Sequence, residues 1–303
     1  RSTLFPYTTL FRSPAGRGPD FFYTRRFAMN LHFPELMRTQ PYVDGRWVQC
    51  GRSFAVNNPA DGGKVADVGD ADVPLAESAL EAAAAAFPAW RDRTAAERCR
   101  LLHRWFELIV EHQEDLALII TTEQGKPLAE ARAELANAWA FVEWFAEEGK
   151  RVYGETIPAP GTDRRIVVIR QPVGVVAALT PWNFPSSMIT RKAAPALAVG
   201  CTFVLRPASA TPLSALALAK LADMAGIPAG VFNVVPSSAS QAIGRLFTES
   251  PRVAKFSFTG STAVGRELMA RCASTVKRVS LELGGNAPFL VFDDADQIGR
   301  AHV

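Results

Sequence analysis

Cysteine is scarce in this sequence. The 303 residues include four cysteines, which lie far apart and form neither a CxxC pair nor a cluster with histidine. This spacing excludes a disulfide framework and a zinc site of the usual kind, and it is typical of reduced thiols. The scarcity therefore predicts a cytoplasmic protein without a bound metal. The four thiols are those of Cys50, Cys99, Cys201 and Cys272.

Two further absences restrict the partners of the protein. No uninterrupted apolar run is long enough to cross a bilayer, which argues against a membrane protein. The charge excess is also small: the net charge is +3, and lysine and arginine are spread along the chain, which argues against a nucleic-acid partner. Hydrophobic residues make up 48% of the chain, which is enough for a soluble globular protein with a sizeable core.

Both ends of the sequence differ from the rest. The opening RSTLFPYTTLFRS has no initial methionine and nearly mirrors itself around Pro6 and Tyr7, as translated adapter DNA would. The last residues, QIGRAHV, look similar. We therefore expect residues 1–28 to be an artefactual or disordered segment, Met29 to be a plausible start, and residues 297–303 to be an artefactual tail.

The first half of the remaining chain predicts helices. The run LAESALEAAAAAF is rich in good helix formers, and Thr94 with Glu97 three residues later forms a capping box that begins a second helix. EQGKP then breaks the pattern, and a further helix is predicted over Leu128–Glu148. We expect these helices to pack against a sheet formed by the second half.

The second half alternates between strand-like and helix-like segments. Such alternation predicts an α/β fold with a doubly wound, mostly parallel sheet. The expected strands are Val173–Thr180, Cys201–Leu205, Gly230–Val235, Val253–Phe258 and Val276–Leu281. The expected helices are Ser187–Val199, Leu213–Ala225, Ala239–Thr248 and Thr262–Ala273.

Three loops follow these strands at the edge of the sheet where such folds bind ligands. They read TPWNFP, RPAS and FTGST, and no GxGxxG fingerprint accompanies them. In the third loop, glycine allows close approach of a ligand and the following helix N-terminus offers N–H donors to an anion. A tight strand-to-helix connection is the alternative. GSTAVGRE has the glycine spacing of a phosphate loop but lacks its lysine, which disfavours nucleotide hydrolysis.

Two polar residues stand in unusual surroundings. Asn183 lies between Pro181 and Pro185, where its amide would either donate to a developing oxyanion or simply belong to a rigid aromatic turn. Glu282 is flanked by Leu281 and Leu283 in VSLELGGNAP, so we expect its carboxylate to lie in an apolar environment, where ionisation is costly.

Taken together, TPWNFP, RPAS, FTGSTAVG and LELGGNAP resemble the aldehyde dehydrogenase superfamily in their order and spacing, from about Pro41 to Asp296. The resemblance implies that residues 41–296 form the NAD(P)-binding domain of that fold. It also implies that Glu282 is the general base, that Asn183 is half of an oxyanion hole, and that Leu283 packs near the nicotinamide. The residues that it places along the dinucleotide are Trp182, Arg206, Ser209, Gly260, Ser261 and Gly265.

The family nucleophile is a cysteine a few tens of residues beyond this glutamate, and no cysteine follows Glu282. We therefore expect the catalytic domain to be missing and the chain itself to be inactive, while its parent is a homo-oligomeric enzyme acting on a small-molecule aldehyde. Two departures affect the cofactor site. Arg206 replaces the usual lysine, and Ser237-Ser238 occupies a place where glycine is common.

Longer stretches resemble the succinate-semialdehyde dehydrogenases most, and Arg191 in MITRK matches the position at which that subfamily anchors the distal carboxylate. Ser209 stands where NAD-selective members often carry an acid, so we expect NADP to be used at least as well as NAD. Ser209 and Arg206, with Arg170 or Lys192 nearby, would accept the 2′-phosphate. The alternatives are a non-catalytic dinucleotide-binding module and an acyl-CoA-forming or phosphorylating relative.

Overall fold

A seven-stranded sheet forms the centre of the fold, in the order β11-β10-β7-β8-β9-β1-β2. The computed structural model describes residues 29–286, 288, 290, 292 and 293, so the expected terminal segments 1–28 and 297–303 lie outside the described residues. The helices of the described part are α1 (Val73–Arg91), α2 (Ala95–Glu111), α3 (Gln113–Gln124), α4 (Leu128–Glu148), α5 (Ser187–Ala198), α6 (Leu213–Met224), α7 (Ser240–Glu249) and α8 (Thr262–Cys272). Its strands are β1 (Tyr42–Val43), β2 (Arg46–Trp47), β3 (Ser53–Asn57), β4 (Lys64–Gly69), β5 (Glu155–Ile157), β6 (Ile166–Val168), β7 (Val175–Leu179), β8 (Thr202–Arg206), β9 (Phe232–Val234), β10 (Val253–Thr259) and β11 (Arg278–Glu282).

Five of the seven strands run parallel, as the alternating pattern predicted. β8 pairs with β7 and β9, and β10 pairs with β7 and β11, all in parallel. The sheet is extended antiparallel by β1, through the pair Tyr42 and Val234, and by β2. Between β1 and β2 lie Asp44 and Gly45, both with positive φ, which is the two-residue hairpin turn that an Asp-Gly pair favours. The predicted doubly wound, mostly parallel sheet is confirmed.

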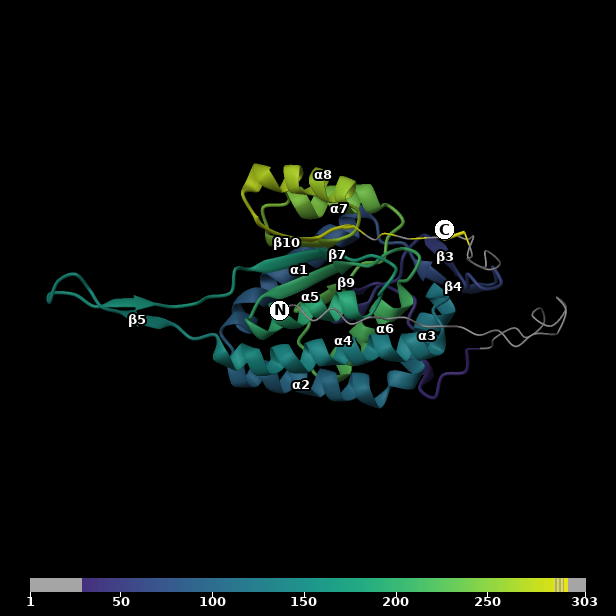
Figure 1. The fold of residues 1–303 in the computed structure, drawn as a ribbon, viewed down its shortest axis with the longest axis horizontal. Helices are drawn as coiled ribbons and strands as arrows, with labels where there is room; N and C mark the ends of the chain where they lie inside the picture. Colours follow the sequence, from purple (N-terminus) through teal and green to yellow (C-terminus); the bar gives the residue numbers. More distant parts are fainter. Residues whose placement is uncertain (1–28, 287, 289, 291, 294–303) are drawn as a thin grey trace. The chain divides into compact units, whose positions relative to one another are not determined.

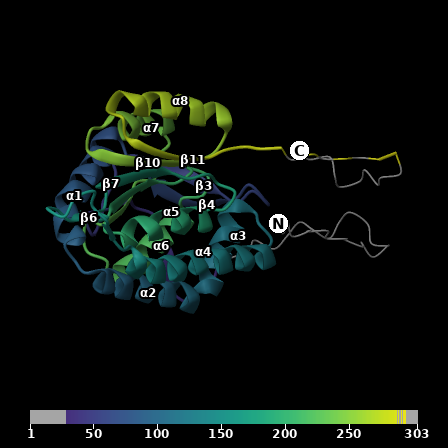
Figure 2. The same cartoon turned by 60° about the vertical axis from the view of Figure 1, so that its left-hand side comes forward.

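Helices cover both faces of the sheet (Figures 1 and 2). α1, α7 and α8 pack on one face, and their apolar side chains share a core cluster with β7 and β10. α5 and α6 lie against the other face, and α2, α3 and α4 lie outside them. α6 is rich in leucine and alanine and is buried along nearly its whole length, because it is enclosed by the sheet and by the outer helices. In the described part of the chain, no helix combines the length and the apolar character that spanning a bilayer requires.

Two short strands between α4 and β7 stay outside the main sheet. β6 pairs antiparallel with β5 in a separate hairpin. Figure 1 shows this hairpin reaching away from the helices. Every residue of β5 and β6 is exposed, so the hairpin makes no contribution to the core.

The sequence predicts one helix from Thr94 to the EQGKP segment, but the structure has two helices there, α2 and α3. The predicted capping box is present, since Thr94 and Glu97 bond reciprocally. The helical path breaks at His112, whose ring stacks on Phe33 at 4.9 Å between centroids. In the first turn of α3, Asp115 accepts N–H bonds from His32 and Phe33. These contacts with a distant segment set the direction of α3, which a local pattern cannot reveal.

Val276 adopts the left-handed conformation, with φ 49° and ψ 32°. This conformation costs an L-residue roughly 1–2 kcal/mol, and a β-branched side chain is among the least suited to it. The side chain is 89% exposed, so it contributes little packing in compensation. We expect Val276→Gly to raise the free energy of unfolding by about 1 kcal/mol in urea titrations. The same substitution at Val264, exposed on α8, should lower it by about as much. A lower stability of Val276→Gly would contradict the strain argument.

Candidate active site

The site lies at the carboxyl ends of three neighbouring parallel strands, β7, β10 and β11. The TPWNFP loop follows β7, and FTGST spans the end of β10 and the start of α8. Thr259 pairs with Glu282 in register, and the Gly260 N–H donates to the Glu282 carbonyl at 3.1 Å. Two of the sequence-predicted site segments are therefore joined by backbone contacts.

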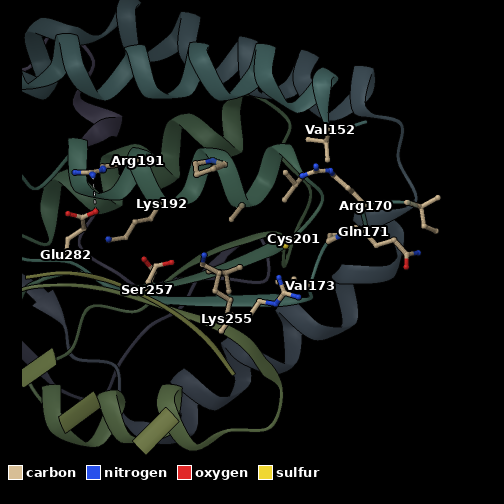
Figure 3. Close-up of a pocket in the computed structure, with 18 residues that line it drawn as sticks. Val152, Arg170, Gln171, Val173, Arg191, Lys192, Cys201, Lys255, Ser257 and Glu282 are labelled. Atoms are coloured by element: carbon tan, nitrogen blue, oxygen red, sulfur yellow. Dashed lines mark hydrogen bonds and ion pairs between the residues drawn. The ribbon is translucent and has the colours of Figure 1, made fainter. Parts of the chain in front are cut away.

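A cavity of about 640 Å³ runs along the face of the sheet covered by α5, from the segment before β7 to Glu282 at the carboxyl end of β11 (Figure 3). Its charged lining is strongly unbalanced, because among the described residues five cationic side chains face it with a single carboxylate, that of Glu282. Such a cavity favours an anionic ligand. The five cations are Arg170, Arg191, Lys192, Lys255 and Arg278.

The structure corrects the expected environment of Glu282. Its side chain is 55% exposed and is not surrounded by apolar groups. β11 alternates strictly: Val279 and Leu281 turn toward the core cluster, whereas Ser280 and Glu282 line the cavity on the opposite face. The flanking leucines suggested a continuous apolar run, but strand side chains alternate between faces. The carboxylate is therefore accessible to solvent and to a ligand.

Arg191 and Glu282 form an ion pair across the cavity. The two charged groups are 3.0 Å apart, with Arg191 reaching over from α5 (Figure 3). Lys192 follows on α5 and is buried; burial, together with the positive charges of Arg191 and Lys255 and against the opposing charge of Glu282, lowers the pKa of its ammonium to about 8. This corner of the cavity thus holds two cations around one carboxylate.

A glycine in the segment after β10 allows close packing of a neighbouring side chain. A Cβ built on Gly265 would lie 2.5 Å from a methyl carbon of Leu283, so a larger residue would displace that side chain. Gly265 is buried in the first turn of α8, and Ser261 begins this helix with its hydroxyl accepting the Val264 N–H. Leu283 and Gly265, which the sequence resemblance places at the nicotinamide and along the dinucleotide, therefore lie in contact with each other.

The N-termini of α5 and α6 are already occupied by protein carboxylates. Glu134 of α4 accepts the N–H groups of Ser186 and Ser187 at the start of α5, at 2.8 and 3.2 Å. Glu123 of α3 does the same for α6, accepting the Leu213 N–H at 2.7 Å. An anion at either helix end would have to displace these hydrogen bonds.

The α8 terminus differs, because the side chain that caps it is the neutral hydroxyl of Ser261. Its dipole is therefore open to an anionic group such as a pyrophosphate. The sequence analysis missed Glu123 and Glu134 as site residues; the only local signal was EQGKP, which was interpreted as a helix end.

The remaining predicted cofactor residues lie along the first two loops. Trp182 and Asn183 are exposed, and Ser209 is half-buried. Arg206 is buried, which lowers the pKa of its guanidinium to about 10, and it donates to the Ser237 carbonyl at 2.7 Å. Among the described residues several buried polar atoms have no hydrogen-bond partner, and three of them lie near the strand ends. These atoms are Arg206 Nε, Thr180 Oγ1 and Thr259 Oγ1.

The expected grouping around a 2′-phosphate is only partly present. Arg170 and Lys192 line the cavity together with Glu282, whereas Arg206 turns to the loop after β9 and does not line it. Arg170 also faces Glu155 of the β5–β6 hairpin at 3.6 Å. Of the residues expected around a 2′-phosphate, Arg206 and Ser209 therefore remain together, at the end of β8 and in the loop that follows it.

None of the four cysteines has the surroundings of an activated nucleophile. Burial raises the pKa of each thiol: Cys50, Cys99, Cys201 and Cys272. Reactive cysteines need the opposite shift, because the thiolate is the attacking species. Cys201 lines the cavity, but it is buried at the start of the β8 segment and serves as a small wall residue.

Buried Glu123 makes the stability of the fold depend on pH. Burial raises the pKa of its carboxyl from 4.5 to about 7, so between these values the folded chain binds more protons than the unfolded chain. The contribution of Glu123 to the free energy of unfolding is therefore fully present below pH 4.5. It falls by about 3 kcal/mol in total as the pH rises through 7.

The substitution Glu123→Gln removes this titration. Urea denaturation between pH 5 and 8 should show the unsubstituted chain losing stability relative to the variant as the pH rises. Exposed Glu114→Gln is the matched control on the same helix. Parallel stability curves for the unsubstituted chain and Glu123→Gln would refute the pH dependence.

Comparison with known proteins agrees with this geometry. A sequence profile described as the aldehyde dehydrogenase family matches residues 47–301. The 3-sulfolactaldehyde dehydrogenase of Pseudomonas putida is 60% identical over 270 residues, which are 88% of this chain and 55% of that protein. The NADP(+)-dependent succinate-semialdehyde dehydrogenase GabD of Escherichia coli is 58% identical, with 88% and 56% covered. A crystal structure of an NADP-dependent enzyme of E. coli superposes with a TM-score of 0.84 at 58% identity, over 88% of this chain and 56% of that one.

The chain spans about half the length of the curated relatives it matches. Within that half, the sheet, the loops at its carboxyl edge and the sequence all agree with one family. Because the family profile covers most of the residues, the chain belongs to the aldehyde dehydrogenase family.

Proposed function

We propose that this chain is the cofactor-binding part of an NAD(P)-dependent dehydrogenase for an aldehyde that carries a second, anionic group, with succinate semialdehyde as the first candidate. One observation carries the proposal: Glu282, at the carboxyl end of β11, and Arg191 face the same cation-lined cavity and pair with each other there. A carboxylate that is accessible there can serve as a base, and a cation beside it can bind the distal charge of the substrate.

The dinucleotide would lie along the strand ends, where it supplies the acceptor for a hydride. Ser261 caps the start of α8 with a neutral hydroxyl, which leaves a positive helix end for the pyrophosphate, and Gly260 and Gly265 stand beside it. The buried, unpartnered Nε of Arg206 is a donor that a ligand can satisfy. Since no carboxylate stands among the residues of the RPAS loop, a 2′-phosphate would meet no repulsion from that loop, which supports the use of NADP as well as NAD.

The proposed reaction uses a thiol that none of the four cysteines here supplies. The thiolate adds to the aldehyde carbon, and the resulting oxyanion accepts a hydrogen bond from the Asn183 amide. Collapse of the oxyanion releases the hydride and leaves a thioester. Glu282 then removes a proton from water, whose hydroxide attacks the thioester and releases the carboxylic acid and the thiolate.

Arg191 would select the anionic aldehyde. Its ion pair with Glu282 is about half exposed, and exposed pairs are worth at most about 1 kcal/mol, so a substrate carboxylate can compete for the guanidinium. The names of the two relatives support the same chemistry, since one specifies a carboxylate-bearing aldehyde and the other a sulfonate-bearing one.

The proposal can be tested in a chimeric enzyme, in which residues 31–286 of this chain replace the matching residues of the E. coli succinate-semialdehyde dehydrogenase. We expect the chimeric enzyme to reduce NADP with succinate semialdehyde, and this chain alone to do so at no detectable rate. A folded chimera without activity toward any semialdehyde, or activity of the isolated chain above that of its Glu282→Gln variant, would refute the proposal.

Replacing Arg191, the proposed anchor of the substrate's distal carboxylate, should weaken substrate binding. In the chimeric enzyme, Arg191→Ala should raise KM for succinate semialdehyde by a factor corresponding to about 1.5–3 kcal/mol, because a charge-assisted hydrogen bond is lost. KM for butanal, which has no second charge, should change much less. Exposed Arg245→Ala on α7 is the control. Equal effects on both aldehydes would contradict the anchoring role.

A further inference from the structure

A buried ion pair lies directly behind the Asn183 loop, which we define as residues 181–185. Lys126 comes from the turn between α3 and α4, and Glu134 comes from α4. Their charged atoms are 2.6 Å apart, and the two side chains are 8% and 0% exposed. A buried pair of this kind is weak support for stability, because removing both charges from water is expensive. Stability alone therefore gives no reason to keep these charges inside.

Lys126 contacts the loop at two points. Its ammonium donates to the backbone carbonyl of Asn183 at 2.8 Å. It also lies 4.0 Å from the centroid of the Phe184 ring, close enough for a cation–π interaction. Both contacts are made to the tip of the loop and reach it from more than fifty residues away in the sequence.

Glu134 holds the other end of the same loop. One carboxylate oxygen pairs with Lys126, while the second accepts the N–H groups of Ser186 and Ser187. The pair thus fixes the loop just at Asn183 and again where α5 begins, and each charged group is kept in place by the other.

The loop has little packing of its own. Trp182 is 57% exposed and Phe184 is 43% exposed, while Asn183 between them is also exposed. A peptide unit is planar, so a carbonyl held by a buried ammonium fixes the orientation of the Asn183 main chain. The permitted directions of the side chain depend on that main chain.

We infer that Lys126 is a positioning residue that sets the direction of the Asn183 amide, with Glu134 holding the ammonium in place. The inference rests on the proposed role of Asn183 as an oxyanion donor. Lys126 acts through Asn183 and touches neither the substrate nor the reacting atoms. Its removal should lower kcat of the chimeric enzyme about 10- to 100-fold, because small errors in geometry weaken transition-state contacts, and should leave KM within about threefold.

Two variants separate positioning from stability. Lys126→Met keeps the apolar stem but leaves the Glu134 charge buried without its partner, so it should also destabilise the fold. The double variant Lys126→Met with Glu134→Gln removes that uncompensated charge, and the glutamine oxygen can still accept from the start of α5. If Lys126 only stabilises, the double variant regains kcat together with its melting temperature. If Lys126 positions Asn183, stability returns and kcat does not. Arg132→Met, which breaks an exposed ion pair on the same helix, is the control.

A second readout needs no enzyme activity. Fluorine NMR of this chain labelled with 5-fluorotryptophan gives a resonance for Trp182, assigned by its loss in Trp182→Phe. In the double variant this resonance should shift or broaden, whereas Arg132→Met should leave it unchanged. An unchanged Trp182 resonance in the double variant would overturn the inference. A changed resonance would also overturn it if the double variant has a normal kcat while Asn183→Ala has a reduced kcat. If Asn183→Ala itself is normal, the proposed function fails, and the fluorine spectrum alone decides whether Lys126 orders the loop.

Discussion

Replacing Asn183 with alanine should lower kcat of the chimeric enzyme about 100- to 1,000-fold, the usual loss when one oxyanion donor is removed. The side chain stands in an exposed loop at the carboxyl end of β7, so truncation leaves no cavity and no buried polar group behind. Stability should therefore change little, and KM for NADP should stay within a few-fold. Steady-state kinetics and thermal melting of the same preparation give both measurements.

Asn137→Ala provides the matched control for this substitution. Asn137 is an exposed asparagine on α4 whose amide bonds only to the carbonyl of Ala133 in the same helix. Its replacement should leave kcat unchanged. A kcat of Asn183→Ala within threefold of the unsubstituted chimera would mean that the amide has no catalytic role and that the loop is the rigid aromatic turn considered as the alternative.

Glu282→Gln should have an effect of similar size, about 100- to 10,000-fold on the steady-state rate, because a glutamine cannot accept the proton of the hydrolytic water. The side chain faces the cavity and pairs only with Arg191 among the described residues. The substitution therefore preserves shape and removes one exposed ion pair, and the fold should be unaffected.

The timing of the loss identifies the step. Hydride leaves before water attacks, so the first turnover of Glu282→Gln should be slowed less than later turnovers, and stopped-flow absorbance of NADPH should show a burst. Glu267→Gln, which breaks an exposed pair with Arg271 on α8, is the control. A steady-state rate within threefold of the unsubstituted chimera would exclude Glu282 as the base.

Much of the fold was predictable because its signals are local. The parallel strands from β7 to β11 and the helices from α5 to α8 lie within a few residues of the predicted ranges, and the helix predicted over Leu128–Glu148 has those bounds. Apolar runs of strand length, separated by helical periodicity, carry that information. The capping box at Thr94 and the turn at Asp44 are equally local.

Features that depend on distant partners were not predictable. The pairing of Tyr42 with Val234 adds the antiparallel edge of the sheet, and nothing near Tyr42 reveals it. The aromatic residues of α4 have a pattern typical of core packing, yet Trp144 is 62% exposed. The role of Lys126 arises from a contact with the Asn183 loop, 57 residues away in the sequence, and that of Glu123 from a contact with the start of α6, 91 residues away. Motifs locate a site, but only tertiary contacts show what supports it.

The alternation along β11 divides the strand into two sets of positions with different tolerance to change. Val279 and Leu281 meet the core, so substitutions there should be limited by folding. Arg278, Ser280 and Glu282 line the cavity and make few demands on the core, so the two of them without a proposed catalytic role, Arg278 and Ser280, can vary at little cost to the fold. A library randomised at Arg278 and Ser280 alone would therefore retain mostly folded proteins while sampling new specificities, which makes this strand a natural starting point for redesigning the choice of aldehyde.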